Sequence, residues 1–394
     1  MSTREPAQVI ESVRAHFVER YGREPAGVWS APGRVNLIGE HTDYNGGLCL
    51  PIALPHRTYA AAAVRDDGVL RVCSLQSEAP AEVALDDVSP ERPGGWASYV
   101  AGVLWALRRE GHDVPGLDVV IDSVVPVGAG LSSSAALECS VGAAVSDLAG
   151  LGLLDDADAR ARLAQACIRA ENEIAGAPTG GMDQSAALLC DDATALLLDC
   201  RSWQTEPVPF DLASAGYALL VTDTRAHHEL VDGQYAARRD ACEEAARILG
   251  VGTLREVPAS GLEAALDRLP TDEMRRRVRH VVTEIDRVER AVAALRAGDL
   301  DEVGRLFDAS HASMRDDYEI SCDELDVATD TARRLGALGA RMTGGGFGGS
   351  CIAIVRADAV DEVSQAIDAA FAERGFTAPS SFAVTAGSSA HRDA

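Results

Sequence analysis

The sequence predicts an α+β fold in two lobes. Helical and strand patterns are mixed along the whole chain, without the strict alternation of strand and helix that a parallel α/β sheet requires. The chain has 394 residues, enough for two domains of ordinary size. A proline-containing polar stretch begins near residue 205, so we expect a first domain over 1–205 and a second over 206–394.

The first half combines helices with strands that are separated by loops. Helical patterns predict helices over 6–21, 96–110, 134–148 and 157–173. The segment 28–75 mixes short β-rich runs with glycine, asparagine and proline, which is typical of strands joined by functional loops. Further strands are predicted over 117–125 and 193–200, and residues 175–184 read as a glycine-rich loop.

The second half is mostly helical. Helices are predicted over 234–249, 272–297, 299–313 and 323–337, and strands over 217–223, 351–355 and 382–386. Ser321 and Glu324 have the spacing of a capping box at the start of the last of these helices. We expect no helix after the strand 351–355, so the glycine-rich loop before that strand is not a dinucleotide motif.

Composition excludes several functions. The chain carries 61 acidic and 36 basic residues, a formal net charge of -25, and every basic residue is an arginine. Without lysine there is no Walker-type phosphate loop and no Schiff base. The acidity argues against nucleic acid or an anionic membrane as a partner. Nine cysteines without a CxxC pair, and no long apolar run, predict reduced thiols in a cytoplasmic protein.

The segment 126–135, PVGAGLSSSA, lies between a predicted strand and a predicted helix. Its glycines let the backbone approach an anion, and the N–H groups and dipole of the helix supply positive potential. Serine hydroxyls can bind Mg²⁺ or a phosphate oxygen. A dinucleotide fingerprint fails because its third glycine is Ser133, and a hydrolase elbow would need GxSxG. A purely structural turn remains an alternative on this motif alone.

Two further segments are rich in polar groups. The segment 33–45, GRVNLIGEHTDYN, packs an arginine, two carboxylates, a histidine and several amides into thirteen residues. A polyhydroxylated ligand needs such a mixture of donors and acceptors, although surface ion pairs are the simpler interpretation. The segment 171–184 ends in Asp183 and Gln184 after a glycine-rich loop, where an aspartate could also be an ordinary helix cap.

The motifs together resemble a known family. The loop at 126–135 is similar to the nucleotide loop of the GHMP kinase superfamily, and 33–45 matches the galactokinase signature G-R-x-N-L-I-G-E-H-x-D-Y-N at every fixed position. The segment at 171–184 and the loop TGGGFGGS at 343–350 also resemble galactokinase motifs. The resemblance covers essentially the whole chain. It implies a ribosomal-protein-like first lobe, a ferredoxin-like second lobe and an active site between them.

The resemblance also implies roles for individual residues. Asp183 and Arg34 would be catalytic, with Asp183 accepting the proton of the sugar hydroxyl and Arg34 keeping that carboxylate ionised. Mg²⁺ would bind Ser134 and Glu171. The residues that would bind the sugar are Glu40, His41, Thr42, Asp43 and Tyr235. The residues that would bind ATP are Ser74, Gly128, Ala129, Gly130, Leu131, Ser132, Ser133 and Ser134.

The resemblance implies a kinase that transfers the γ-phosphoryl group of ATP to the anomeric hydroxyl of galactose. We expect a monomer or a weak homo-oligomer. A kinase for N-acetylgalactosamine or arabinose is the alternative, and a sugar sensor without activity is a more distant one, because the serine loop and Asp183 are intact. His227 stands before His228 where many family members carry a basic residue, which puts a phosphate contact there in doubt.

Overall fold

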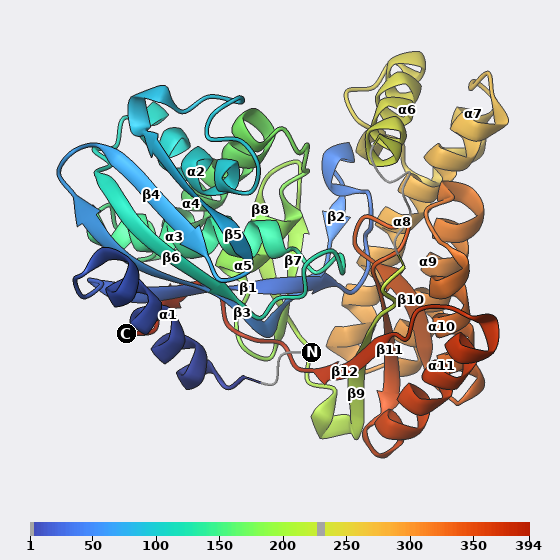
Figure 1. Cartoon of the computed structure of the whole chain (residues 1–394). Helices are drawn as coiled ribbons and strands as arrows, with labels where there is room; N and C mark the ends of the chain where they lie inside the picture. The colour runs from blue at the N-terminus through green and yellow to red at the C-terminus, as the bar shows by residue number, and fades with distance from the viewer. Residues whose placement is uncertain (1–3, 227–232) are drawn as a thin grey trace.

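The computed structural model describes residues 4–226 and 233–394, and it has two lobes that lie side by side (Figure 1). The first contains a six-stranded sheet in the order β13-β1-β3-β6-β4-β5. Neighbouring strands are antiparallel except β4 and β6, which are parallel. The strands are β1 (Gly27–Asn36), β3 (Pro51–Arg65), β4 (Val69–Ser74), β5 (Ser77–Ala84), β6 (Gly116–Ser123) and β13 (His391–Arg392).

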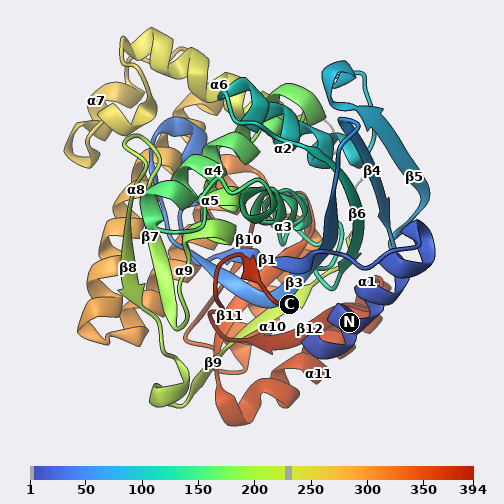
Figure 2. The same ribbon diagram turned by 90° about the vertical axis from the view of Figure 1, so that its left-hand side faces the viewer.

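Helices cover both faces of this sheet. Successive residues of a strand point to opposite faces, so Val28 packs with Phe17 on one side while Trp29 packs with Val141 on the other. Helix α1 (Pro6–Tyr21) therefore covers the first face. The second is covered by a layer in which α3 is central and seen along its axis in Figure 2. This layer consists of α2 (Ala97–Arg109), α3 (Ser133–Leu148), α4 (Ala157–Arg169) and α5 (Met182–Leu189).

A three-stranded sheet, in the order β2-β7-β8, completes the first lobe. Its strands are β2 (Leu48–Cys49), β7 (Thr194–Asp199) and β8 (Gln204–Pro209). Strand β8 pairs with β7 across the expected domain division at 205/206, and the C-terminal strand β13 returns to pair with β1. The division itself stays a prediction, while the two-lobed α+β fold is confirmed.

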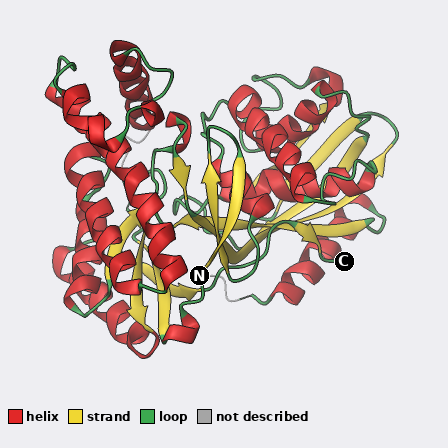
Figure 3. Ribbon diagram, turned by 180° about the vertical axis from the view of Figure 1, so that it is seen from behind, coloured by secondary structure: helices red, strands yellow, loops and turns green. Residues whose placement is uncertain are grey.

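The second lobe packs helices on a four-stranded antiparallel sheet in the order β10-β11-β9-β12 (Figure 3). The strands are β9 (Tyr217–Asp223), β10 (Gly339–Thr343), β11 (Ser350–Arg356) and β12 (Ser380–Val384). The helices are α6 (Gln234–Leu249), α7 (Leu262–Leu266), α8 (Asp272–Ala297), α9 (Leu300–Ser313), α10 (Asp323–Arg334) and α11 (Val360–Arg374). One hydrophobic cluster joins this lobe to the first, since it contains both Ile38 and Val288.

Three expectations about the elements were wrong. Helix α5 begins inside the segment read as a loop, and α11 follows β11 where no helix was expected, although Val363, Ile367 and Phe371 are spaced four apart. The capping box at α10 does not form. Cys322 is the N-cap residue, and Ser321 instead donates its hydroxyl to Asp326 at 2.6 Å.

The helices and the cysteines can be compared with what the composition predicts. Within the two described ranges, no helix is both long and apolar enough to cross a membrane. The cysteines are free thiols, and most of them are buried.

Candidate active site

A cavity of about 550 Å³ lies between the lobes. Its walls come from the loop after β1, the loop before α3, the start of α5, and the glycine-rich loop between β10 and β11. The structure therefore brings together segments that are far apart in the sequence. The predicted site residues that line the cavity are Arg34, Glu40, His41, Asp43, Gly128, Gly130, Leu131, Ser132, Ser133, Ser134, Glu171, Asp183 and Tyr235.

Arg34 and Asp183, which both line this cavity, form a partly buried ion pair. The strand β1 has an irregularity between Pro32 and Arg34, which changes the pairing register there. The Arg34 guanidinium donates from Nε to Oδ1 of Asp183 at 2.9 Å, and one terminal nitrogen lies 2.8 Å from the same oxygen. Its other terminal nitrogen donates to the carbonyl of Gly130 at 2.6 Å. The Arg34 side chain therefore contacts both the Asp183 carboxylate and the loop at 126–135, which we call the phosphate loop.

The glycine-rich loop of the second lobe packs directly on the phosphate loop. The Ser350 hydroxyl donates to the carbonyl of Ala129 at 2.7 Å. Gly344 has a φ of 87°, and a Cβ at this position would lie 2.8 Å from the carbonyl oxygen of Gly130. Only a residue without a side chain fits there, so glycine permits the close contact between the two lobes.

Glu171 and Ser134 form the part of the cavity that fits a magnesium ion. Glu171 lies in a π-helical turn, Ala170–Ala175, and Gln184 donates its amide to the carboxylate. Burial, with the nearby charge of Asp183, raises the pKa of Glu171 to about 7. A hydroxyl and a carboxylate are hard oxygen donors of the kind that Mg²⁺ prefers. In the described ranges there is no group of three or more His, Cys, Asp or Glu that could hold a metal ion. Ser134 and Glu171 would therefore be part of a coordination shell in which Mg²⁺ keeps several waters.

His41 is a neutral side chain with both ring nitrogens engaged. Burial lowers the pKa of His41 to about 3. Because the carbonyl of Gly345 can only accept, Nε2 carries the proton and donates to it at 3.1 Å. Nδ1 then accepts from the Tyr44 hydroxyl at 2.7 Å, and the His41 ring packs 5.0 Å from that of Tyr235. The histidine thus supports the wall of the cavity, and the expectation that it holds a sugar hydroxyl remains a prediction.

Asp43 also lines the cavity. Burial, together with the nearby charge of Asp183, raises the pKa of Asp43 to about 6, and Arg34 opposes the rise. Gly180 lies directly against this side chain, and a Cβ there would overlap the carboxylate. Asp43 is therefore a buried acceptor whose protonation changes within a few units of neutral pH.

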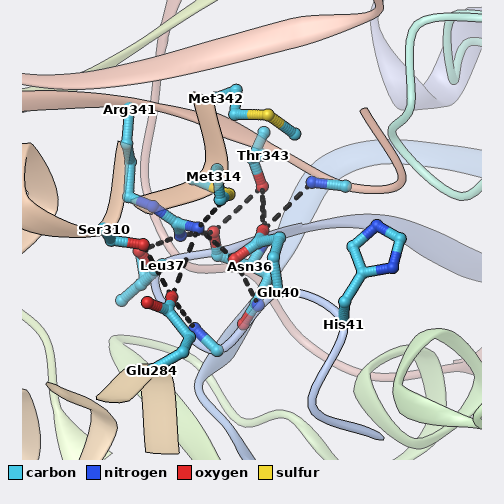
Figure 4. Close-up of polar contacts among 12 residues, drawn as sticks. Asn36, Leu37, Glu40, His41, Glu284, Ser310, Met314, Arg341, Met342 and Thr343 are labelled. Atoms are coloured by element: carbon cyan, nitrogen blue, oxygen red, sulfur yellow. Dashed lines mark hydrogen bonds and ion pairs between the residues drawn. The ribbon is translucent and has the colours of Figure 1, made fainter. Parts of the chain in front are cut away.

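Glu40 and Thr42 are turned toward protein atoms. Glu40 is 1 % exposed, and its carboxylate accepts from Asn36 at 2.9 Å, from the backbone N–H of Gly344 at 3.0 Å, and from Arg341 (Figure 4). The Thr42 hydroxyl donates to backbone carbonyls of its own loop. Glu40 still reaches the cavity wall, whereas Thr42 does not line it. Their assignment to sugar binding stays a prediction.

Two residues predicted to bind ATP, Ser74 and Ala129, do not line the cavity. Ser74 ends β4, bonds with Gln76 and does not line the cavity, so its contact with ATP stays a prediction. His227 and His228 lie outside the described residues. Ala129 is buried within the loop at 126–135, does not line the cavity, and contributes a carbonyl to Ser350, so its contact with ATP also stays a prediction.

Three buried charged side chains that support the residues of the cavity were not predicted from the sequence. Arg341 on β10 and Glu284 on α8 contact the loop that contains Glu40, and Glu138 on α3 accepts from Gln184 at 2.9 Å. All three are charged residues at buried positions. In the sequence they could be noticed only as charged residues within otherwise apolar helix and strand patterns, which does not identify their partners.

Comparisons with known proteins agree with this geometry. Three family models match: the galactokinase galactose-binding signature over residues 15–64, the GHMP kinase N-terminal domain over 98–191 and the GHMP kinase C-terminal domain over 291–373. A galactokinase from Streptomyces coelicolor is 52% identical over 98% of both chains, and one from Bos taurus is 43% identical over 91% of both.

Solved structures give the same picture. The crystal structure of Lactococcus lactis galactokinase complexed with galactose has a TM-score of 0.92 and 33% identity, and covers 98% of this chain and 100% of that one. A mevalonate kinase from Methanococcus jannaschii has a TM-score of 0.65 at 16% identity, over 91% of this chain and 98% of that one, and therefore shares the fold alone.

Proposed function

This chain belongs to the galactokinase family of GHMP kinases, and from that premise we propose how its cavity phosphorylates galactose. The substrate is D-galactose, ATP is the phosphoryl donor, and the products are galactose 1-phosphate and ADP. The observation that supports this most strongly is the Arg34–Asp183 pair, held at 2.8 Å beside the phosphate loop in the cavity between the lobes. A proton acceptor and a fixed cation are thereby placed next to an anion-binding backbone.

Phosphoryl transfer requires an in-line arrangement of the attacking and leaving oxygens together with stabilisation of charge on the transferred group. Asp183 accepts the proton of the anomeric hydroxyl as the sugar oxygen bonds to the γ-phosphorus and the bond to ADP breaks. Arg34 pairs with this carboxylate and offers positive charge to the phosphoryl oxygens. It is the principal side-chain cation we assign to the transition state, since the chain has no lysine.

Ser134 and Glu171 would hold Mg²⁺, which neutralises charge on the β- and γ-phosphates when bound. The backbone N–H groups around Gly128, Gly130 and Leu131 would bind the phosphates together with the N-terminus of α3. These groups form a local exception in a chain whose net charge of -25 repels nucleotide. Asp43 and Tyr235, which both line the cavity, would bind sugar hydroxyls.

A coupled assay of ADP release over galactose, N-acetylgalactosamine, arabinose and glucose tests this function. We expect galactose to give the highest kcat/KM. Turnover of N-acetylgalactosamine or arabinose without turnover of galactose would overturn the choice of sugar. Binding of galactose and ATP without release of ADP from any sugar would identify a sensor and overturn the kinase.

A further inference from the structure

Ser132 adopts a backbone conformation that is costly for a residue with a side chain. Its φ of 59° and ψ of 50° lie in the left-handed region, which glycine occupies far more readily than serine. It lies among residues that line the cavity, between Leu131 and Ser133. Strained residues of this kind persist where the surrounding structure fixes them, often at functional sites.

Ser132 does not cap helix α3 with its side chain, as a serine at this position usually does. Ser132 is the N-cap residue of α3, where a serine hydroxyl usually accepts a hydrogen bond from the first turn of the helix. The Ser132 side chain makes no such bond. Its hydroxyl instead donates to Oδ2 of Asp183 at 2.5 Å. Neither helix propensity nor capping accounts for the residue.

With the Ser132 contact, both oxygens of the Asp183 carboxylate accept a hydrogen bond. Oδ1 of Asp183 accepts from Nε of Arg34 and lies 2.8 Å from a second nitrogen of the same guanidinium, and Oδ2 accepts the hydroxyl of Ser132. With a different partner on each oxygen, the carboxylate group cannot rotate about its Cβ–Cγ bond without breaking a charge-assisted hydrogen bond. Oδ2 faces a neutral hydroxyl whereas Oδ1 faces the Arg34 cation, so Oδ2 is the oxygen better placed to receive a proton.

We propose that Ser132 is a positioning residue for phosphoryl transfer, whose hydroxyl fixes Oδ2 of Asp183 as the atom that receives the sugar proton. This inference rests on the function proposed above. The sugar O–H bond breaks and its proton passes to Oδ2 as the sugar oxygen bonds to phosphorus and the bond to ADP breaks. The Ser132 hydroxyl is not consumed, because it can turn from donor to acceptor once Oδ2 is protonated.

Two substitutions at one position separate the hydroxyl from the backbone. Ser132→Ala removes the hydroxyl and keeps the Cβ, whereas Ser132→Gly removes both and favours the left-handed conformation. If the hydroxyl positions the base, both variants lose about tenfold to a hundredfold in kcat, while KM for galactose stays within about twofold. The acidic limb of the kcat profile also moves to higher pH in both, because a carboxylate without this donor binds a proton more readily.

The control is Ser140→Ala, a buried serine of the same helix whose hydroxyl donates to the carbonyl of Leu137 at 2.9 Å. It should keep kcat and the pH profile. A Ser132→Gly variant as active as the parent would assign the residue a backbone role only. Raised KM for ATP at unchanged kcat would assign it to nucleotide binding, and either result overturns the inference. An inactive parent enzyme would instead refute the proposed function, so the two failures are distinguishable.

Discussion

Arg341 on β10 of the second lobe forms an ion pair with Glu40 of the first lobe, 301 residues away in the sequence and fully inside the protein (Figure 4). The same guanidinium donates to the backbone carbonyls of Leu37 and Asn36 at 2.5 and 3.2 Å. Glu284 lies 3.7 Å from it and accepts from the backbone N–H of Gly39 at 3.0 Å. The loop that lines the sugar side of the cavity therefore takes its shape from charged side chains of the other lobe.

Replacing Arg341 by methionine should weaken both stability and sugar binding. The change leaves Glu40 without its buried countercharge, and breaking such a pair costs about 3–5 kcal/mol. Urea unfolding measures that loss, and galactose titration should show a raised Kd because the loop at 36–40 loses its support. The control is Arg356→Met on β11, whose fully exposed pair with Asp358 should contribute little to stability. Equal stabilities of the two variants would contradict the prediction.

The catalytic pair gives a prediction on rate. Asp183→Asn keeps the shape of the side chain but removes the proton acceptor, so kcat should fall about a hundredfold to ten-thousandfold with little change in galactose affinity. Arg34→Ala should also lower kcat far more than affinity. Single-turnover kinetics with saturating galactose measure the chemical step, and Asp192→Asn on the exposed turn after α5 is the matched control. Near-normal turnover in either active-site variant would refute the assignment.

Local motifs were predictable because each is a short run with its own chemistry. The segments 33–45 and 126–135 match family motifs and both contribute residues to the cavity, and the apolar spacing on α8 predicts which of its valines face inward. The same spacing does not predict what His280 and Glu284, which are also buried on α8, contact. Their partners are Glu40 and Gly39 of the other lobe, at the backbone carbonyl and N–H respectively. No pattern within a helix indicates a contact with a loop some 240 residues earlier.

The hydrogen bond of Ser132 was missed for a different reason. The serine run predicts ATP binding by all three serines, with Ser134 also on Mg²⁺, and it gives no sign of a contact between Ser132 and Asp183, because a sequence does not give backbone dihedrals. The left-handed conformation at Ser132 turns its side chain toward Asp183, whereas Ser134 lies close enough to Glu171 to affect its pKa, which burial has raised to about 7. Serines of one short run thus contact two different carboxylates of the cavity.

Galactose binding should depend on pH through Asp43. Burial raises its pKa to about 6, so the carboxylate is ionised above that pH and neutral below it. If the ionised form accepts a sugar hydroxyl, the Kd for galactose should be constant above about pH 7 and rise as the pH falls through 6, approaching tenfold per unit. Calorimetric titration without nucleotide measures sugar binding by itself, separate from the Mg²⁺ binding to which Glu171 is assigned. Asp43→Asn should bind weakly and without this pH dependence; an unchanged slope in that variant would exclude Asp43 as the titrating group.

The magnesium assignment can be tested with two glutamates of the same π-helical turn. Glu171 is buried beside Ser134 and points into the cavity, whereas Glu173 is exposed and pairs with Arg169 at 3.1 Å. Glu171→Gln removes a carboxylate that Mg²⁺ would use, so the Mg²⁺ concentration for half-maximal activity should rise at least about tenfold. Glu173→Gln breaks only a surface pair and should leave that concentration and the stability nearly unchanged. Activity assays over a magnesium series at fixed ATP decide the matter, and equal requirements in both variants would show that Glu171 does not bind the metal.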